Sequence, residues 1–263
     1  MSLHRRLLPA AALLAMLLAA GAPPSANPPL AATPISRMDL PWWKARHEAA
    51  LRRLHAAPAD LLFIGDSITE NWERHGPLPQ MDFEPVWQHF YGDRNAVNLG
   101  FKGDSTAHLL WRLRNGEIDG IAPKAAVVLI GANNLGRVHW SAADTVIGIE
   151  TVVAELQKRL PNTKLLLISV LPSERSAWVD ENTVAINAAL AERYGKNSEV
   201  AWFDATRLFT KNGKTDRSLY YDPALTPSEP TLHPDRRGME KLAIAIEPIL
   251  AGMMGDRNKL PRN

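Results

Sequence analysis

Five short apolar runs recur along this chain, and a glycine, proline or aspartate follows each of them within two residues. The runs are Ala59–Ile64, Asn95–Leu99, Ala125–Ile130, Lys164–Val170 and Glu199–Phe203. Segments of this length that are rich in β-branched residues or leucine are typical of strands buried on both faces of a parallel sheet. This feature restricts the chain to folds in which helices cover both faces of such a sheet.

Amphipathic stretches separate the apolar runs. Apolar residues recur at spacings of three and four in the stretches Thr106–Arg114, Ala143–Leu160, Glu181–Tyr194 and Gly238–Leu250. Strands that alternate with helices predict an α/β fold with right-handed crossovers. We therefore predict a three-layer α/β/α sandwich with a five-stranded parallel sheet in flavodoxin-like order. One domain over residues 38–255 contains all these elements, and its active site is expected at the carboxyl ends of the strands.

The N-terminus carries the pattern of a secretory signal. A basic start, His4-Arg5-Arg6, precedes a 16-residue apolar run over 7–22 and several small residues. A membrane-spanning helix needs about 20 apolar residues, so a cleaved signal peptide over 1–26 is favoured over a stable membrane anchor. The proline-rich leader 27–37 is expected to be extended and solvated, and residues 256–263 form a short tail. The protein is thus expected to be periplasmic or secreted.

Composition excludes several classes of function. The chain has no cysteine, which rules out disulfides, zinc–thiolate sites, a cysteine nucleophile and a lipid-modified N-terminal cysteine. The formal net charge is +2, and no segment concentrates lysine and arginine, so nucleic acid is not an expected partner. With 46% hydrophobic residues, the chain has enough apolar material for a sizeable core.

Polar or glycine-rich motifs lie at the ends of three predicted strands and before the last helix. They are Gly65-Asp66-Ser67, the turn around Gly103, Asn133-Asn134 and His233-Pro234. Each motif alone is more typical of a turn or a helix cap. Because all four come to one sheet edge, together they supply a nucleophile, a backbone N–H, a side-chain amide and a base. Those are the groups that acyl transfer requires.

The motifs resemble those of the SGNH (GDSL-like) hydrolase superfamily, and more narrowly its platelet-activating-factor acetylhydrolase-like branch. The stretches that carry the resemblance are FIGDSITENW (63–72), NLGFKGDSTAHLLWRLRNGEIDGIAPK (98–124), VVLIGANN (127–134) and TLHPDRRG (231–238). The resemblance implies that Ser67 is the nucleophile, Gly103 and Asn133 are oxyanion donors, and His233 is the base. It also implies hydrolysis of a short-chain, acetyl-type ester without a metal or an organic cofactor.

One departure from the family pattern concerns the third catalytic residue. The family has aspartate three residues before the histidine, where this chain has Pro230. Glu229, a main-chain carbonyl or the more remote Asp222 are the candidate replacements. Because of this departure, a catalytically weak SGNH-like domain that binds glycans stays an alternative interpretation. A lysophospholipase or thioesterase of the same fold is the alternative among enzymes. Expected export favours an extracytoplasmic substrate such as an acetylated glycan.

Overall fold

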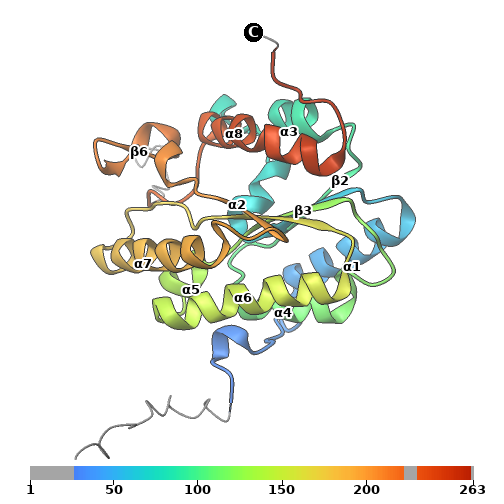
Figure 1. Cartoon of the computed structure of the whole chain (residues 1–263), viewed down its shortest axis with the longest axis horizontal. Helices are drawn as coiled ribbons and strands as arrows, with labels where there is room; N and C mark the ends of the chain where they lie inside the picture. Colours follow the sequence, from blue (N-terminus) through green and yellow to red (C-terminus); the bar gives the residue numbers. More distant parts are fainter. Residues whose placement is uncertain (1–26, 222–229, 262–263) are drawn as a thin grey trace, which may run out of the picture.

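The computed structural model describes residues 27–221 and 230–261 (Figure 1). Its centre is a parallel sheet of five strands. They are β1 (Leu61–Gly65), β2 (Ala96–Gly100), β3 (Ala125–Leu129), β4 (Lys164–Ile168) and β5 (Val200–Phe203). The strand order is β2-β1-β3-β4-β5, which is the flavodoxin-like order. All five predicted strands and the predicted topology are therefore confirmed.

Helices cover both faces of the sheet, as Figure 1 shows. One face carries α1 (Pro41–Ala56), α4 (Thr106–Arg112), α6 (Ala142–Arg159) and α7 (Ala177–Tyr194); the other carries α3 (Glu84–Tyr91) and α8 (Arg236–Met254). Two short helices, α2 (Ser67–Glu70) and α5 (Ala132–Gly136), begin shortly after β1 and β3. A π-helical turn, Leu113–Glu117, continues α4, and β6 (Thr210–Lys211) pairs with β7 (Lys214–Thr215) in a small hairpin. The four predicted helical stretches correspond to α4, α6, α7 and α8.

Successive residues of a strand point into two separate cores. In β1, Leu62 and Ile64 belong to the core beneath α4, α6 and α7. Leu61 and Phe63 belong to the core beneath α3 and α8. This alternation follows from the pleat of a strand, and burial on both faces explains why the strands are almost continuously apolar.

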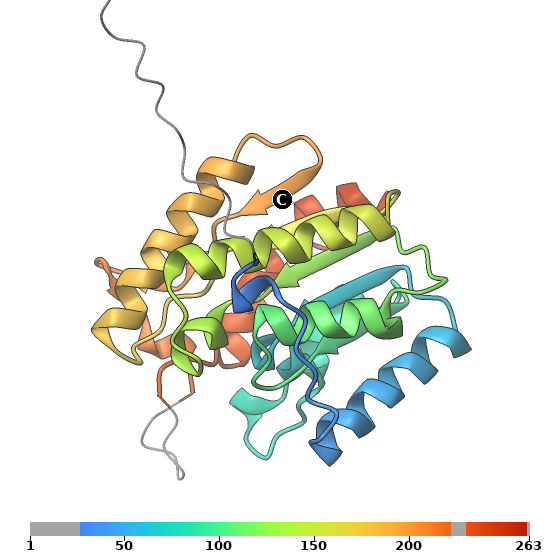
Figure 2. The same ribbon diagram turned by 90° about the horizontal axis from the view of Figure 1, so that it is seen from below.

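The segment before α1 differs from the expected solvated leader. A short 3-10 helix, Leu30–Ala32, lies across α4 and α6 (Figure 2), and Ala31 is only 1% exposed. Thr106 Oγ1 donates a hydrogen bond to Ala31 O at 2.7 Å, and Ile35 N donates to Ala107 O at 3.1 Å. Close packing is possible because Gly148 of α6 has no Cβ, which would lie 2.7 Å from Ala31 O.

The predicted signal peptide, 1–26, lies outside the described residues. Among the helices that the structure describes, none combines the length and the hydrophobicity that a membrane span requires.

A fully buried guanidinium ties the carboxyl edge of the sheet together. Arg112 Nη2 donates to the main-chain oxygens of Gly65 (3.3 Å) and Leu99 (3.2 Å), at the ends of β1 and β2. Its Nε donates to Asp104 Oδ2 at 2.8 Å, and its Nη1 donates to Glu117. All three charged side chains are buried, and the charge of Arg112 is compensated by the two carboxylates.

We predict that Arg112→Met lowers the free energy of unfolding by about 3–5 kcal/mol, because it removes the one buried guanidinium that both carboxylates share and leaves Asp104 with Arg37 and Glu117 with His47. Arg114→Met is the matched control. Arg114 follows on the same helical segment, is 43% exposed and pairs with Glu155 on the surface, so its loss should cost about 1 kcal/mol or less. Urea denaturation measures both. Equal, small losses for the two variants would show that the buried network does not hold this edge.

Candidate active site

Ser67 is the first residue of α2 and lies just beyond the end of β1. The Asp66 carboxylate caps this helix, because its Oδ1 accepts a hydrogen bond from Ile68 N at 3.0 Å. Gly100 of the neighbouring strand lets α2 approach the sheet, since a Cβ there would lie 2.1 Å from Glu70 N. Ser67 is consequently held in a fixed position at the sheet edge, with 8% of its surface exposed.

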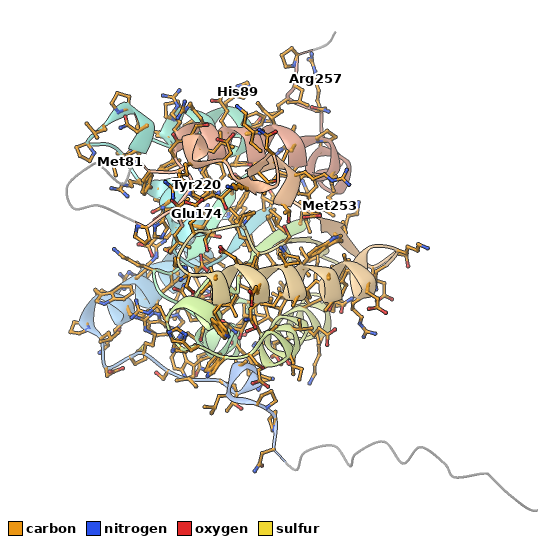
Figure 3. All side chains as sticks on the ribbon, turned by 90° about the vertical axis from the view of Figure 1, so that its left-hand side faces the viewer. Met81, His89, Glu174, Tyr220, Met253 and Arg257 are labelled. Atoms are coloured by element: carbon orange, nitrogen blue, oxygen red, sulfur yellow. The ribbon has the colours of Figure 1, made fainter. Side chains whose placement is uncertain are left out.

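The loop before α8 is anchored to the same edge by Tyr220. Its hydroxyl donates to Pro172 O, just after β4, at 2.6 Å, and Tyr220 forms a β-bridge with Pro234. Figure 3 shows Tyr220 beside Glu174, whose backbone N–H donates to Thr231 O at 2.8 Å. Burial raises the pKa of the Tyr220 hydroxyl, so this group remains a protonated donor.

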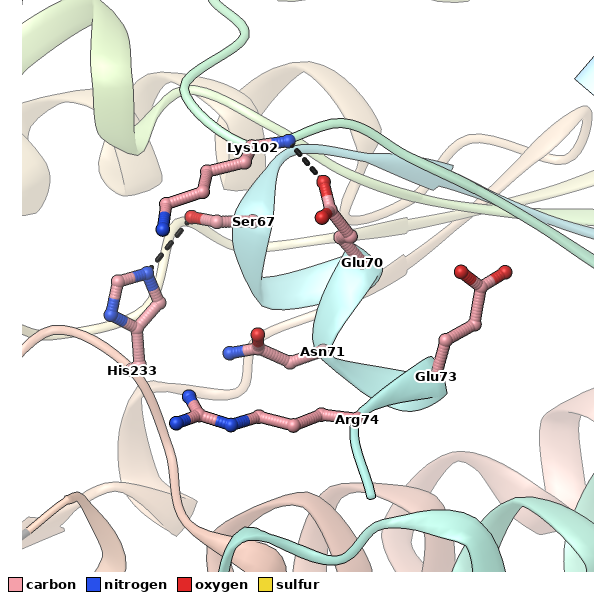
Figure 4. Close-up of a pocket in the computed structure, with 7 residues that line it drawn as sticks. All are labelled: Ser67, Glu70, Asn71, Glu73, Arg74, Lys102 and His233. Carbon is pink, nitrogen blue, oxygen red and sulfur yellow. Dashed lines mark hydrogen bonds between the residues drawn. The ribbon is translucent and has the colours of Figure 1, made fainter. Parts of the chain in front are cut away.

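This anchored loop brings His233 onto Ser67. Ser67 Oγ lies 2.9 Å from His233 Nε2, although the two residues are 166 positions apart in the chain (Figure 4). The backbone of His233 is held as well, because Tyr221 N donates to its carbonyl oxygen at 3.2 Å. A serine hydroxyl in hydrogen-bond contact with an imidazole nitrogen is the arrangement in which the imidazole can remove the hydroxyl proton.

The residue that orients His233 stays a prediction. Pro230 is the first described residue after the gap and is exposed. Both candidate carboxylates, Glu229 and Asp222, lie outside the described residues.

Asn133 and Gly103, the two predicted oxyanion donors, come together at the turn after β2. Asn133 Nδ2 donates one of its two N–H groups to Asp104 O at 3.0 Å. Gly103 has a φ of +76°, which favours glycine, and an added Cβ would lie 2.9 Å from Arg137 Nη1. The backbone N–H groups of Ser67 and Gly103 donate to no acceptor in the described part of the chain. Both are therefore donors without an acceptor among the described residues.

The second asparagine of the pair has a different position. Asn134 is fully buried, its Oδ1 accepts from Thr106 N at 3.0 Å, and its Nδ2 donates to Thr106 Oγ1 at 2.7 Å. It fastens α5 to the start of α4, which leaves Asn133 as the asparagine beside the Gly103 turn.

Ser67 and His233 open into a cavity of about 400 Å³. The residues that line it are Ser67, Glu70, Asn71, Glu73, Arg74, Lys102 and His233 (Figure 4). Gly103 and Asn133 line a different cavity, with His108 and Arg137. Glu70, Asn71, Arg74 and Lys102 were not predicted as site residues. Three of them lie inside the motif stretches quoted above, but isolated polar residues carry no periodic signal that would have singled them out.

The carboxyl of Asp66 has an unusual titration. Burial raises its pKa to about 6. A raised pKa means that the folded state binds the proton more tightly than the unfolded chain does. Stability from this group is therefore fully present below pH 3.8, the ordinary pKa, and is lost as the pH rises to about 6.

We predict that Asp66→Asn raises the free energy of unfolding at pH 8, by at most about 3 kcal/mol, because asparagine caps the helix equally well without the buried charge. The difference in free energy of unfolding between the variant and wild type should grow as the pH rises from about 4 to about 6, and it should stay constant at higher pH. Urea denaturation at a series of pH values tests this. A variant that is less stable than wild type at pH 8 would contradict it.

The chain is similar to known ester hydrolases over most of its length. The model of the GDSL-like Lipase/Acylhydrolase family matches residues 63–241. Platelet-activating factor acetylhydrolase IB subunit alpha2 of Rattus norvegicus is 30% identical over 164 residues, which are 62% of this chain and 66% of that protein. The IB subunit beta homolog of Drosophila melanogaster is 28% identical over 217 residues, 74% of this chain and 91% of that protein. The chain thus spans just under two thirds of the first relative.

Solved structures share the fold at low sequence identity. A GDSL-like lipase from Bacteroides thetaiotaomicron superposes with a TM-score of 0.61 and 18% identity, over 79% of this chain and 98% of that one. A carbohydrate esterase family 3 protein from Talaromyces cellulolyticus gives a TM-score of 0.53 and 18% identity, over 76% and 99% of the two chains.

Proposed function

Because the chain belongs to the GDSL-like lipase/acylhydrolase family, we propose that it is a serine ester hydrolase that works through an acyl-enzyme on Ser67. The observation that carries this proposal is the 2.9 Å contact between Ser67 Oγ and His233 Nε2. Family membership supplies the class of reaction, and this contact supplies the nucleophile and the base in one place.

In the proposed mechanism, His233 Nε2 accepts the proton of Ser67 as Oγ attacks the ester carbonyl. The tetrahedral intermediate collapses, the protonated imidazole gives its proton to the leaving alcohol, and an acyl-serine remains. Water then attacks the acyl-serine with His233 again as base, which releases the acid and restores the hydroxyl.

The negative charge of the tetrahedral intermediate needs donors, and three are proposed. The backbone N–H groups of Ser67 and Gly103 have no acceptor among the described residues, and Asn133 has a second amide N–H beyond the one given to Asp104. Donors that are fixed in place before the reaction stabilise a developing oxyanion without the cost of reorganisation. The bond from Asn133 to Asp104 O fixes the amide in this way.

For the substrate, we propose a short acyl group, in particular acetyl, on an extracytoplasmic molecule such as a glycan. The curated relatives are acetylhydrolases. The cavity at Ser67 is lined by charged and amide side chains, which suit a polar substrate better than a long alkyl chain. The expected export signal in the first 26 residues motivates the location.

We predict that the purified protein hydrolyses p-nitrophenyl acetate with a higher kcat/KM than the butyrate and octanoate esters. Ser67→Ala should lower the rate on acetate by at least about 10³-fold, because it removes the nucleophile. Ser198→Ala, an exposed serine just before β5, is the matched control and should keep the wild-type rate. Unchanged hydrolysis by folded Ser67→Ala would overturn the mechanism, and a preference for octanoate would overturn the short-acyl assignment.

A further inference from the structure

The cavity beside Ser67 contains two acidic side chains, and both are already engaged. Glu73 Oε2 lies 2.9 Å from Arg46 Nη1. Glu70 Oε2 lies 3.7 Å from Arg46 Nε and accepts a hydrogen bond from the backbone N–H of Lys102. Arg46 comes from α1 and is not among the residues that line the cavity. Its guanidinium therefore compensates the negative charge of both carboxylates without lining the cavity itself.

The two basic side chains of the cavity have no such partner. In the described part of the chain, neither Lys102 nor Arg74 has a carboxylate within ion-pair distance. Figure 4 shows that the Lys102 ammonium and the Arg74 guanidinium both point to the His233 side of the cavity. The Glu73 carboxylate points away from His233, and the Glu70 carboxylate points to the backbone N–H of Lys102. Among the described residues, the charges next to Ser67 that are not already paired are consequently positive.

The backbone of Lys102 and the side chain of Arg74 are held in position by contacts that involve no carboxylate on either cation. The main chain of Lys102 is fixed at both polar groups, since its N–H donates to Glu70 and its carbonyl accepts from Arg37 Nη1 at 3.0 Å. The Arg74 guanidinium stacks over the Tyr221 ring, 4.9 Å from its centre. A side chain that is positioned in advance, as Arg74 is, loses less conformational entropy when it binds a ligand.

We propose that the ester substrate carries a carboxylate or phosphate group close to the scissile bond, and that Lys102 and Arg74 bind this anion. The inference rests on the proposed ester hydrolysis at Ser67 and specifies its substrate class. Arginine suits either anion through its paired N–H donors, and lysine supplies a point charge. Because neither cation pairs with a carboxylate among the described residues, no ion pair seen there has to break when the anion binds.

The test uses three aryl acetates that differ in charge: methyl 4-acetoxybenzoate, which is neutral, 4-acetoxybenzoate and 4-acetoxyphenyl phosphate. The kcat/KM of each is divided by its rate of hydrolysis in hydroxide, which removes differences in intrinsic reactivity. For wild type at low salt, we expect at least one anionic ester to exceed the neutral ester by about tenfold, and added salt should shrink this ratio. The anion that is preferred identifies carboxylate or phosphate as the recognised group.

Variants then assign the preference to the two cations. Lys102→Gln and Arg74→Gln should each lower the anionic-to-neutral ratio about threefold, a size within the range of one exposed charge pair, so that together they account for the tenfold preference. Lys196→Gln, an exposed lysine after α7, is the control and should leave the ratio and the neutral rate as in wild type.

Three outcomes would overturn the inference. The first is equal normalised rates on all three esters in wild type. The second is an anionic preference that survives in both variants. The third is an equal fall of kcat on neutral and anionic esters in Lys102→Gln, which would place Lys102 at the reacting carbonyl. In each case Ser67-dependent hydrolysis of the neutral ester would leave the proposed function intact, whereas no hydrolysis of any acetate would overturn both.

Discussion

The buried guanidinium of Arg112 is the constraint on which the active edge of this molecule depends. Its donors hold the ends of β1 and β2 through Gly65 O and Leu99 O, and it compensates the Asp104 carboxylate beside the Gly103 turn. Asp104 also accepts from Trp43 Nε1 at 2.8 Å and pairs with Arg37. One network of buried charges thus positions the nucleophile's strand, the glycine turn, α1 and the segment before it. Such networks hold a geometry well only when every member is paired.

The carboxyl edge of the sheet also brings together catalytic groups from distant parts of the chain. Ser67 comes from the turn after the first strand and His233 from the loop before the last helix, and the two meet because both elements end at the same edge. Apolar packing of α8 against α3 and the sheet fixes the start of the helix that follows His233. The chemistry is therefore carried by a few polar residues, while two apolar cores set their positions.

The sequence was sufficient for the elements that depend on local pattern. The apolar runs predicted all five strands, and the motif resemblance led to Ser67 and His233, which the structure places in contact. Helix α1 was missed because its buried residues, Trp43, His47 and Leu54, form too sparse and too polar a stripe to show helical periodicity. The packing of residues 30–37 depends on the missing Cβ at Gly148. The proposed role of Lys102 depends on the pairing of the cavity's carboxylates with Arg46. Such pairings become visible only in three dimensions.

Covalent labelling of the nucleophile tests the central claim most directly. Paraoxon phosphorylates a serine hydroxyl only where a neighbouring base activates it, and peptide mass spectrometry locates the adduct. The predicted result is one diethylphosphoryl group per chain, attached to Ser67, formed in step with loss of esterase activity and absent from His233→Ala at the same reagent concentration. An adduct on a different serine, or undiminished ester hydrolysis by a protein fully labelled at Ser67, would contradict the assignment of Ser67 as the nucleophile.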